Sequence, residues 1–218
     1  MRVSGWKSIS KCAAGILGIA VVLSAAAKPP TLHAVSGARA GQTPQARAQE
    51  IALSVDPTQS KVHWSVDSTL HMVHGTFTLK SGAMHFEPES GKAGGEIVVL
   101  ATSGESGDNS RDAKMHKEVL ESGKYPDVIF RPTSVEGKLA GSGDSDVKLH
   151  GTFVLHGGEH EIVVPVHAEL NGESWKGTGK FGVPYIQWGL KNPSNFLLKV
   201  QPIVNVELEL AGSVGTKK

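Results

Sequence analysis

The sequence has almost no cysteine. Among its 218 residues there is one, Cys12, which lies in an apolar stretch near the start of the chain. Without that stretch the protein would hold neither a disulfide nor a thiolate metal ligand. The remaining chain must therefore fold by burying a hydrophobic core, and it is long enough to do so.

An excess of charge of either sign is also absent. The chain has 22 Lys and Arg residues against 21 Asp and Glu residues, a formal net charge of +1. Removing residues 1–27, which hold three basic and no acidic side chains, would change this to −2. Nothing in this balance indicates binding to nucleic acid or to an anionic membrane surface.

Long hydrophobic runs are lacking except over residues 12–27, which follow Arg2, Lys7 and Lys11. This run is shorter than the roughly 20 apolar residues that cross a bilayer, and Ala25-Ala26-Ala27 offers a cleavage site. We therefore interpret residues 1–27 as a secretory signal peptide and expect a periplasmic or secreted protein. Residues 28–49, which mix Pro, Gly, Ala and Gln without an aromatic residue, are expected to form a flexible linker.

Residues 50–212 alternate apolar and polar residues in short segments. Val62, Trp64 and Val66, for example, alternate with polar neighbours, which is typical of a strand with one buried face. Similar segments are Phe77 with Leu79, Met84 with Phe86 after an expected turn at Gly82, and residues 96–100, 128–130, 149–155, 162–170, 175–181 and 204–210. About eight such strands predict an all-β domain, a sandwich or an up-and-down barrel, followed by a polar tail over residues 213–218.

One hairpin register can be derived from the pattern. A two-residue turn at Gly157-Gly158 would place Phe153 opposite Ile162 and Leu149 opposite Val166. A three-residue loop would turn one apolar face outward, so we favour the two-residue turn.

The main break in the alternation is residues 108–123, which predict one short helix. Asn109 followed by Asp112 imitates a capping box, and Gly123 is placed for a C-cap. Met115 and Val119, one helical turn apart, are expected to pack the helix across an end or side of the barrel.

Several motifs together resemble a known family. The most specific are Arg111-Asp112 at the helix start and residues 125–130 (YPDVIF), supported by residues 73–77 (VHGTF) and 149–157 (LHGTFVLHG). In this order and spacing they are similar to the YceI-like domain over about residues 55–212. The resemblance implies an antiparallel, lipocalin-like periplasmic barrel associated with polyisoprenoid lipids. Residues 181–190 (FGVPYIQWGL) depart from that family, in which an Arg precedes a short Phe-Gly turn.

The inward-facing positions offer no pair of carboxylates, no Ser/His/Asp grouping and no phosphate-binding loop. We therefore expect a binding protein, not an enzyme, with no cofactor and no metal site. The ten histidines include no pair at chelating distance in the predicted strands, and we read them as surface residues.

The predicted ligand contacts are the inward aromatic residues and two glycines that leave space on one strand. They are Trp64, Phe77, Phe86, Phe130, Phe153, Gly177, Gly179, Phe181 and Trp188. Arg111 and Asp112 are candidates for polar contact with a ligand headgroup. The alternative is structural: Asp112 complements the helix N-terminus and Arg111 pairs with a neighbouring carboxylate or carbonyl.

These observations favour an exported protein that holds a long apolar chain in its lumen, such as an isoprenoid or a quinone-like lipid. A membrane protein that exchanges this ligand is the expected macromolecular partner. Two alternatives stay open: a structural or interaction module with a filled barrel, and a metal-dependent hydrolase.

The interpretation of the leader makes the first testable prediction. Protein recovered from the cell envelope should begin near residue 28, because the basic start, short apolar run and small residues suit signal peptidase. N-terminal sequencing checks this. A chain that still begins at Met1 and resists extraction from membranes would indicate an anchor instead.

Overall fold

The computed structural model describes residues 50–216, so the predicted signal peptide and linker lie outside the described residues. The strands are β1 (Ile51–Val55), β2 (Lys61–Val66), β3 (Val73–Glu87), β4 (Lys92–Glu105), β5 (Asp127–Glu136), β6 (Gly143–Leu155), β7 (Gly158–Asn171), β8 (Ser174–Val183) and β9 (Val204–Thr216). A short helix, α1 (Asn109–Lys114), continues into a π-helical turn, η1 (Met115–Val119), between β4 and β5. This confirms the predicted all-β class with one short helical segment.

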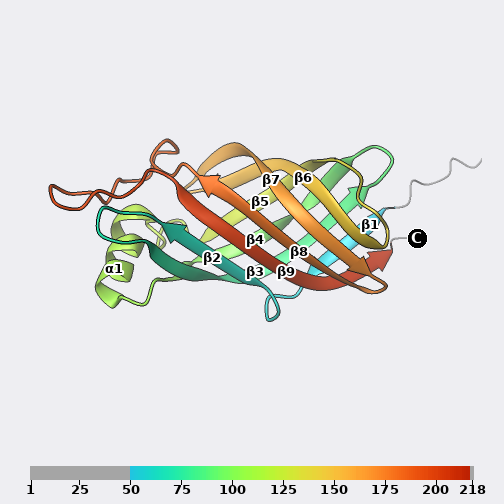
Figure 1. The fold of residues 1–218 in the computed structure, drawn as a ribbon, viewed down its shortest axis with the longest axis horizontal. Coiled ribbons are helices and arrows are strands. Elements are labelled where there is room, and N and C mark those ends of the chain that lie inside the picture. The colour runs from blue at the N-terminus through green and yellow to red at the C-terminus, as the bar shows by residue number, and fades with distance from the viewer. Residues whose placement is uncertain (1–49, 217–218) are drawn as a thin grey trace, which may run out of the picture. The chain divides into compact units, whose positions relative to one another are not determined.

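The sheet closes because β1 and β2 share one strand position. Both pair antiparallel with β3 on one side and β9 on the other, and residues 56–60 loop out between them. From β9 the order runs through β8, β7, β6, β5 and β4, and β4 pairs with β3. The nine strands therefore form a closed antiparallel barrel of eight strand positions (Figure 1).

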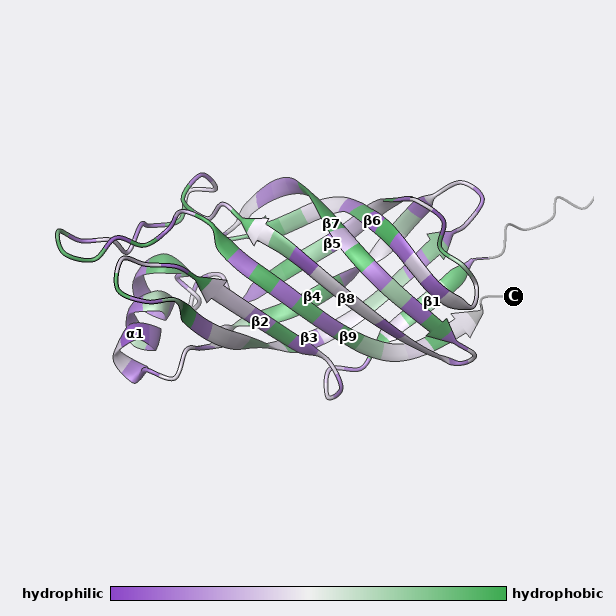
Figure 2. Ribbon diagram, viewed as in Figure 1, coloured by the Kyte–Doolittle hydropathy of each residue, from purple (hydrophilic) through white to green (hydrophobic). Residues whose placement is uncertain are grey.

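The buried residues of the barrel form two clusters, a large one and a small one. The end that holds β1 is filled by one cluster of buried residues, among them Leu53, Phe86, Leu170 and Trp175. A smaller cluster of Leu155, Val183, Tyr185 and Leu190 packs against Val119 and Leu120, next to α1. Figure 2 shows the alternation that produces these clusters, with hydrophobic and hydrophilic bands succeeding each other along the strands. The core is therefore densest at the end away from α1.

The predicted register of the β6–β7 hairpin was wrong by two residues. The turn consists of His156 and Gly157, not Gly157 and Gly158, and Phe153 pairs with His160 instead of Ile162. Both turn residues have positive φ, 53° and 76°, as a type I′ turn requires. Histidine tolerates this conformation better than most residues. Because the shift is even, every side chain keeps the face that the alternation predicted.

The caps of the helical segment also differ from the prediction. Asp108, not Asn109, caps α1: its carboxylate accepts a hydrogen bond from the backbone N–H of Arg111 at 2.9 Å. At the far end Glu121, not Gly123, adopts the left-handed conformation, with φ of 44°. The π-helical turn carries the chain past the expected cap, because Leu120 N–H bonds to the carbonyl of Met115, five residues back.

Two further boundaries were misplaced. Gly82 is not a turn: β3 runs through it, and a Cβ there would lie 2.6 Å from a methyl group of Val55. The residues expected as a polar tail continue β9, which pairs Ser213–Thr216 with Ile51–Ser54. Both errors have one cause, since the sequence pattern did not reveal β1, the strand that packs on Gly82 and pairs with the end of β9.

Gly212 provides a test of this closure. A Cβ there would overlap the backbone carbonyl oxygen of Ser54. Gly212→Ala should therefore force β1 away from β9 and lower the free energy of unfolding by about 1–3 kcal/mol, the usual cost of overpacking. Gly215→Ala is the matched control on the same strand, because its Cβ would meet Ala52 only at 3.8 Å. Denaturant melts measure both, and equal effects would contradict the closure described here.

Candidate ligand-binding cavity

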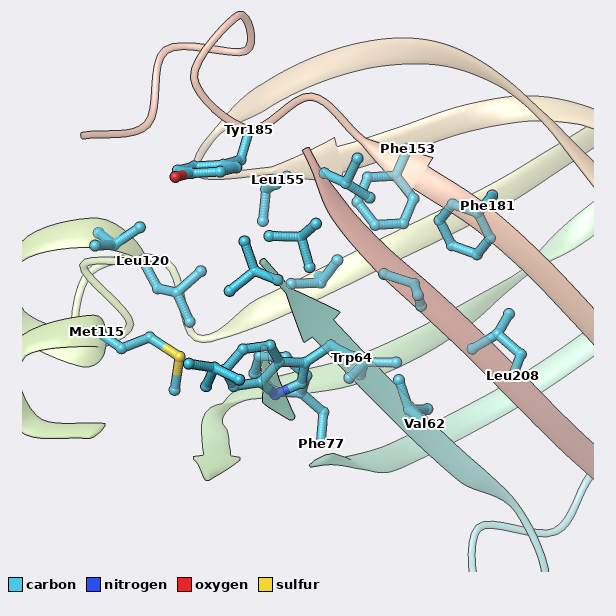
Figure 3. Close-up of a pocket in the computed structure, with 18 of the residues that line it drawn as sticks. Val62, Trp64, Phe77, Met115, Leu120, Phe153, Leu155, Phe181, Tyr185 and Leu208 are labelled. Carbon is cyan, nitrogen blue, oxygen red and sulfur yellow. The ribbon is translucent and has the colours of Figure 1, made fainter. Parts of the chain in front are cut away.

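A cavity of about 560 Å³ occupies the half of the barrel nearest α1. Most of its wall is built from inward-facing residues of the strands, among them Val62, Phe181 and Leu208 (Figure 3), and also Val166 and Val206. The helical segment and two connections supply the rest. This volume lies within the range of small-molecule sites, roughly 300–1,000 Å³. The barrel is therefore hollow at one end and filled at the other.

Trp175 forms the floor of the cavity. It is 3% exposed, lines the cavity, and belongs to the cluster that fills the far end. Its indole N–H donates to the backbone carbonyl of Ser54 in β1 at 2.9 Å. The floor is thereby fixed to the strand that closes the barrel, which holds the depth of the cavity constant.

The mouth lies at the α1 end, where three connections meet. Ser68, Leu70 and His71 come from the β2–β3 connection, and Pro193, Leu198 and Val200 come from the β8–β9 connection. The helical segment contributes Asp108, Ser110, Arg111, Lys114, Met115, Val119 and Leu120. Met115 and Val119 therefore cover part of this end of the barrel with apolar side chains. The charged residues of the lining also come from the helical segment, so they lie at the mouth.

Seven of the nine residues predicted to contact ligand line this cavity, and the other two do not. Those in the lining are Trp64, Phe77, Phe130, Phe153, Gly177, Gly179 and Phe181. Phe86 is absent from it because it is packed, 3% exposed, within the cluster at the filled end. Trp188 is absent because it lies outside the strands, stacked on His160 with ring centroids 4.2 Å apart.

The two glycines of β8 leave less room than the sequence suggested. A Cβ on Gly177 would lie 3.0 Å from the Trp175 ring, and one on Gly179 would lie 3.1 Å from the carbonyl oxygen of Pro165. Much of the space over Gly177 is therefore taken by Trp175. The volume of the cavity comes instead from medium-sized residues such as Val166, Val206 and Leu208.

Arg111 and Asp112 both bind Ser106, just before the helix. The Arg111 guanidinium donates to the Ser106 hydroxyl at 2.7 Å and to its carbonyl at 2.9 Å. Asp112 accepts hydrogen bonds from the hydroxyl and backbone N–H of the same serine. Arg111 also reaches the cavity lining, but Asp112 does not. In this arrangement both side chains hold the helix against the end of β4.

Asp108 is the one carboxylate in the lining of this cavity. The backbone N–H of Arg111 holds the pKa of its carboxyl below the usual value for aspartate. A capped, ionised carboxylate is a poor proton acceptor at neutral pH.

Among residues 50–216 no group of three His, Cys, Asp or Glu side chains is placed to hold a metal ion. No helix within the same residues has the length and apolar character that would let it span a membrane.

Two buried hydrogen-bond donors in the wall have no hydrogen-bond partner among residues 50–216. They are the indole N–H of Trp64 and the hydroxyl of Tyr185 (Figure 3). Burial raises the pKa of Tyr185, so its hydroxyl keeps its proton at neutral pH.

The sequence prediction missed Tyr185 as a lining residue, although residues 183–185 lie in the segment that departs from the family pattern. It also missed Val206 and Leu208 as lining, because it favoured aromatic residues over the aliphatic face of the last strand.

Comparisons with known proteins agree with this architecture. The family model described as "YceI-like domain" matches residues 53–211. The crystal structure of Burkholderia cenocepacia BcnA superposes with a TM-score of 0.58 at 17% identity, covering 72% of this chain and 99% of that one. A polyisoprenoid binding domain from Saccharophagus degradans superposes with a TM-score of 0.56 at 14% identity, covering 75% and 98%. At these identities the structural matches show the fold. A search of the curated proteins found no match.

The unpartnered hydroxyl of Tyr185 leads to a stability prediction. A buried polar group without a partner costs about 1–3 kcal/mol. Tyr185→Phe should therefore leave the free energy of unfolding of lipid-free protein unchanged or raise it by about 1 kcal/mol. Tyr125→Phe, at the other tyrosine of the chain, is the control and should change stability by less than about 0.5 kcal/mol. A clear loss of stability in Tyr185→Phe, measured by denaturant melts, would mean that the hydroxyl has a partner in the folded protein.

Proposed function

The chain belongs to the YceI-like domain family, and from that premise we propose that it is an exported carrier that holds a long apolar chain, such as an isoprenoid, in its barrel. The cavity is the observation that carries this proposal. Its wall is apolar from the Trp175 floor to the mouth, so an elongated hydrocarbon could leave water along its whole length. Removing apolar surface from water contributes roughly 25 cal/mol per Å².

The family supports the same chemistry. A structural neighbour is described as a polyisoprenoid binding domain, and it shares the barrel over 75% of this chain. A barrel of eight strands is just wide enough either to be filled by its own side chains or to hold one small ligand. The cavity above Trp175 supports the second of these. It weighs against the structural module with a filled barrel.

The two unpartnered donors favour a ligand that is not pure hydrocarbon. Both side chains line the cavity, but neighbouring protein atoms cover the Trp64 N–H and the Tyr185 O–H, so each ring would have to shift before it could donate to an oxygen of a quinone, an alcohol or an ester. A simple alkane offers no such acceptor. Both act by binding and orienting the ligand, without proton transfer. We propose further that the protein is a binding protein and not an enzyme, and that it needs no cofactor.

A substitution that fills the lumen tests the proposal. Val206 lines the cavity, and Val206→Trp should occupy ligand space and weaken binding of geranylgeraniol about tenfold, or about 1.4 kcal/mol. The stability of delipidated protein should change by less than about 0.5 kcal/mol, because the new ring enters empty volume. In a filled barrel the same change would cost about 1–3 kcal/mol.

The matched control is Val163→Trp, the same replacement on the outer wall, where Val163 is 43% exposed. It should leave ligand binding unchanged. A fluorescence titration with the isoprenoid, beside thermal melts of lipid-free parent and variants, gives both measurements. A parent protein that does not bind the isoprenoid, together with a destabilised Val206→Trp variant, would contradict the carrier function.

A further inference from the structure

The mouth of the barrel carries large apolar side chains that face solvent. We define the rim patch as Leu70 and Met72 of the β2–β3 connection with Phe196 and Leu197 of the β8–β9 connection. Their exposed fractions are 74%, 49%, 94% and 83%. Single exposed apolar residues are ordinary, but a contiguous group on a soluble protein marks an interaction surface.

The two connections form one unit. The backbone N–H of Thr69 bonds to the Lys199 carbonyl at 3.0 Å, and that of Gln201 bonds to the Asp67 carbonyl at 2.9 Å. Ser68 and Val200 form a β-bridge between these contacts. The rim patch is therefore one surface built from two segments of the chain that are far apart in sequence.

The tip that carries Phe196 and Leu197 has a defined shape. The side-chain oxygen of Asn195 accepts hydrogen bonds from the backbone N–H groups of Leu197 and Leu198, at 2.9 and 2.8 Å. The Asn195 N–H in turn bonds to the Leu198 carbonyl at 2.8 Å. This turn holds the two large side chains out in solvent, so their exposure is built into the fold.

The patch continues into the cavity. Leu70 belongs to both, and Leu198 and Val200, next to the tip in sequence, also line the cavity. Figure 1 shows the β8–β9 connection projecting beyond the strands at the α1 end, and Figure 2 shows hydrophobic residues at its tip. An apolar track therefore runs from the outermost tip of this end to the lumen.

We propose that the rim patch docks the mouth of the barrel onto the surface of a lipid bilayer. A projecting, convex apolar tip suits insertion between fluid lipid chains, which need no complementary groove. Residues 184–203 contain no carboxylate, and of their two lysines Lys191 pairs with Glu118 at 2.6 Å, so this connection brings no negative charge of its own toward phosphate headgroups. The patch itself does not depend on what the cavity holds, but its use in ligand exchange rests on the proposed function. With the mouth on the membrane, a long apolar chain could pass into the lumen without crossing water.

Flotation with phosphatidylcholine vesicles tests the proposal, and vesicles that also contain phosphatidylglycerol measure any contribution of charge. The parent protein should float with both. The double variant Phe196→Ser/Leu197→Ser should lose at least about tenfold in partitioning, because both apolar side chains leave the interface. Val163→Ser, which removes an exposed apolar side chain from the outer wall of the barrel, is the control and should change partitioning less than about twofold. Parent and variants are all produced without residues 1–27, the predicted signal peptide, and all share residues 28–49, so any lipid affinity of that segment is common to them.

The docking proposal would be overturned by a parent that does not float, or by a double variant that floats as well as the parent. It would also be overturned if the parent forms a concentration-dependent dimer that vesicles do not affect and that the double variant no longer forms. This last result would assign the rim patch to a contact with a second copy of the chain.

Titration with geranylgeraniol separates the docking proposal from the carrier function. The double variant should bind the isoprenoid as the parent does, so lost flotation with intact binding assigns the defect to docking. Flotation without isoprenoid binding in the parent would instead contradict the carrier function and leave docking standing.

Discussion

The pairing of β1 and β2 with both β3 and β9 is the interaction on which the rest of the structure depends. An open sheet would leave two edges of unpaired backbone groups, and here one strand position made of two short segments joins them. β1 meets β9 so closely at Gly212 that no side chain fits there. The same strand accepts the indole hydrogen bond of Trp175 through the Ser54 carbonyl. Closure of the sheet and the floor of the cavity are therefore fixed by the same few residues.

Closure also sets the width of the barrel, so the size of the inward side chains decides what remains empty. At one end Phe86, Leu170 and Trp175 fill the interior. Toward α1 the inward positions of β9 carry Val204, Val206 and Leu208, and these leave the volume that the cavity occupies. Met115, Val119 and Leu120 cover this end with apolar groups but do not fill it. The interior is thus packed at one end and hollow at the other.

Much of the fold was predictable because alternation of period two determines which face of each strand is buried. The inward positions of β6, β7, β8 and β9 followed from it, and an error of two residues in the β6–β7 register left every face unchanged. Pairing over long sequence distances was not predictable in this way. β1 is only five residues long, and its place between β3 and the end of β9 has no signal in the local pattern. In the candidate site, too, local pattern was predictable from the sequence and long-range packing was not. Inward aromatic residues on strands could be identified from the sequence. Phe86 and Trp188 do not line the cavity, because the depth of Phe86 in the barrel and the position of the loop that carries Trp188 depend on tertiary packing.

The half of the barrel nearest α1 combines two features that are unfavourable for an isolated protein. Trp64 and Tyr185 bury donors that have no hydrogen-bond partner within the described part of the chain, and the rim patch exposes large apolar groups to water. Neither feature contributes to closing the barrel, since the strands pair and the base packs without them. A polar ligand atom in the cavity would relieve the first, and a lipid surface at the mouth would relieve the second. The buried donors and the rim patch both lie along the apolar track that runs from solvent to the Trp175 floor. The unfavourable features of the structure are therefore found where a ligand would enter. A barrel that served only as a rigid module would be more stable with larger side chains in the cavity and polar residues at the rim. In this protein the cavity is open and the rim residues are apolar.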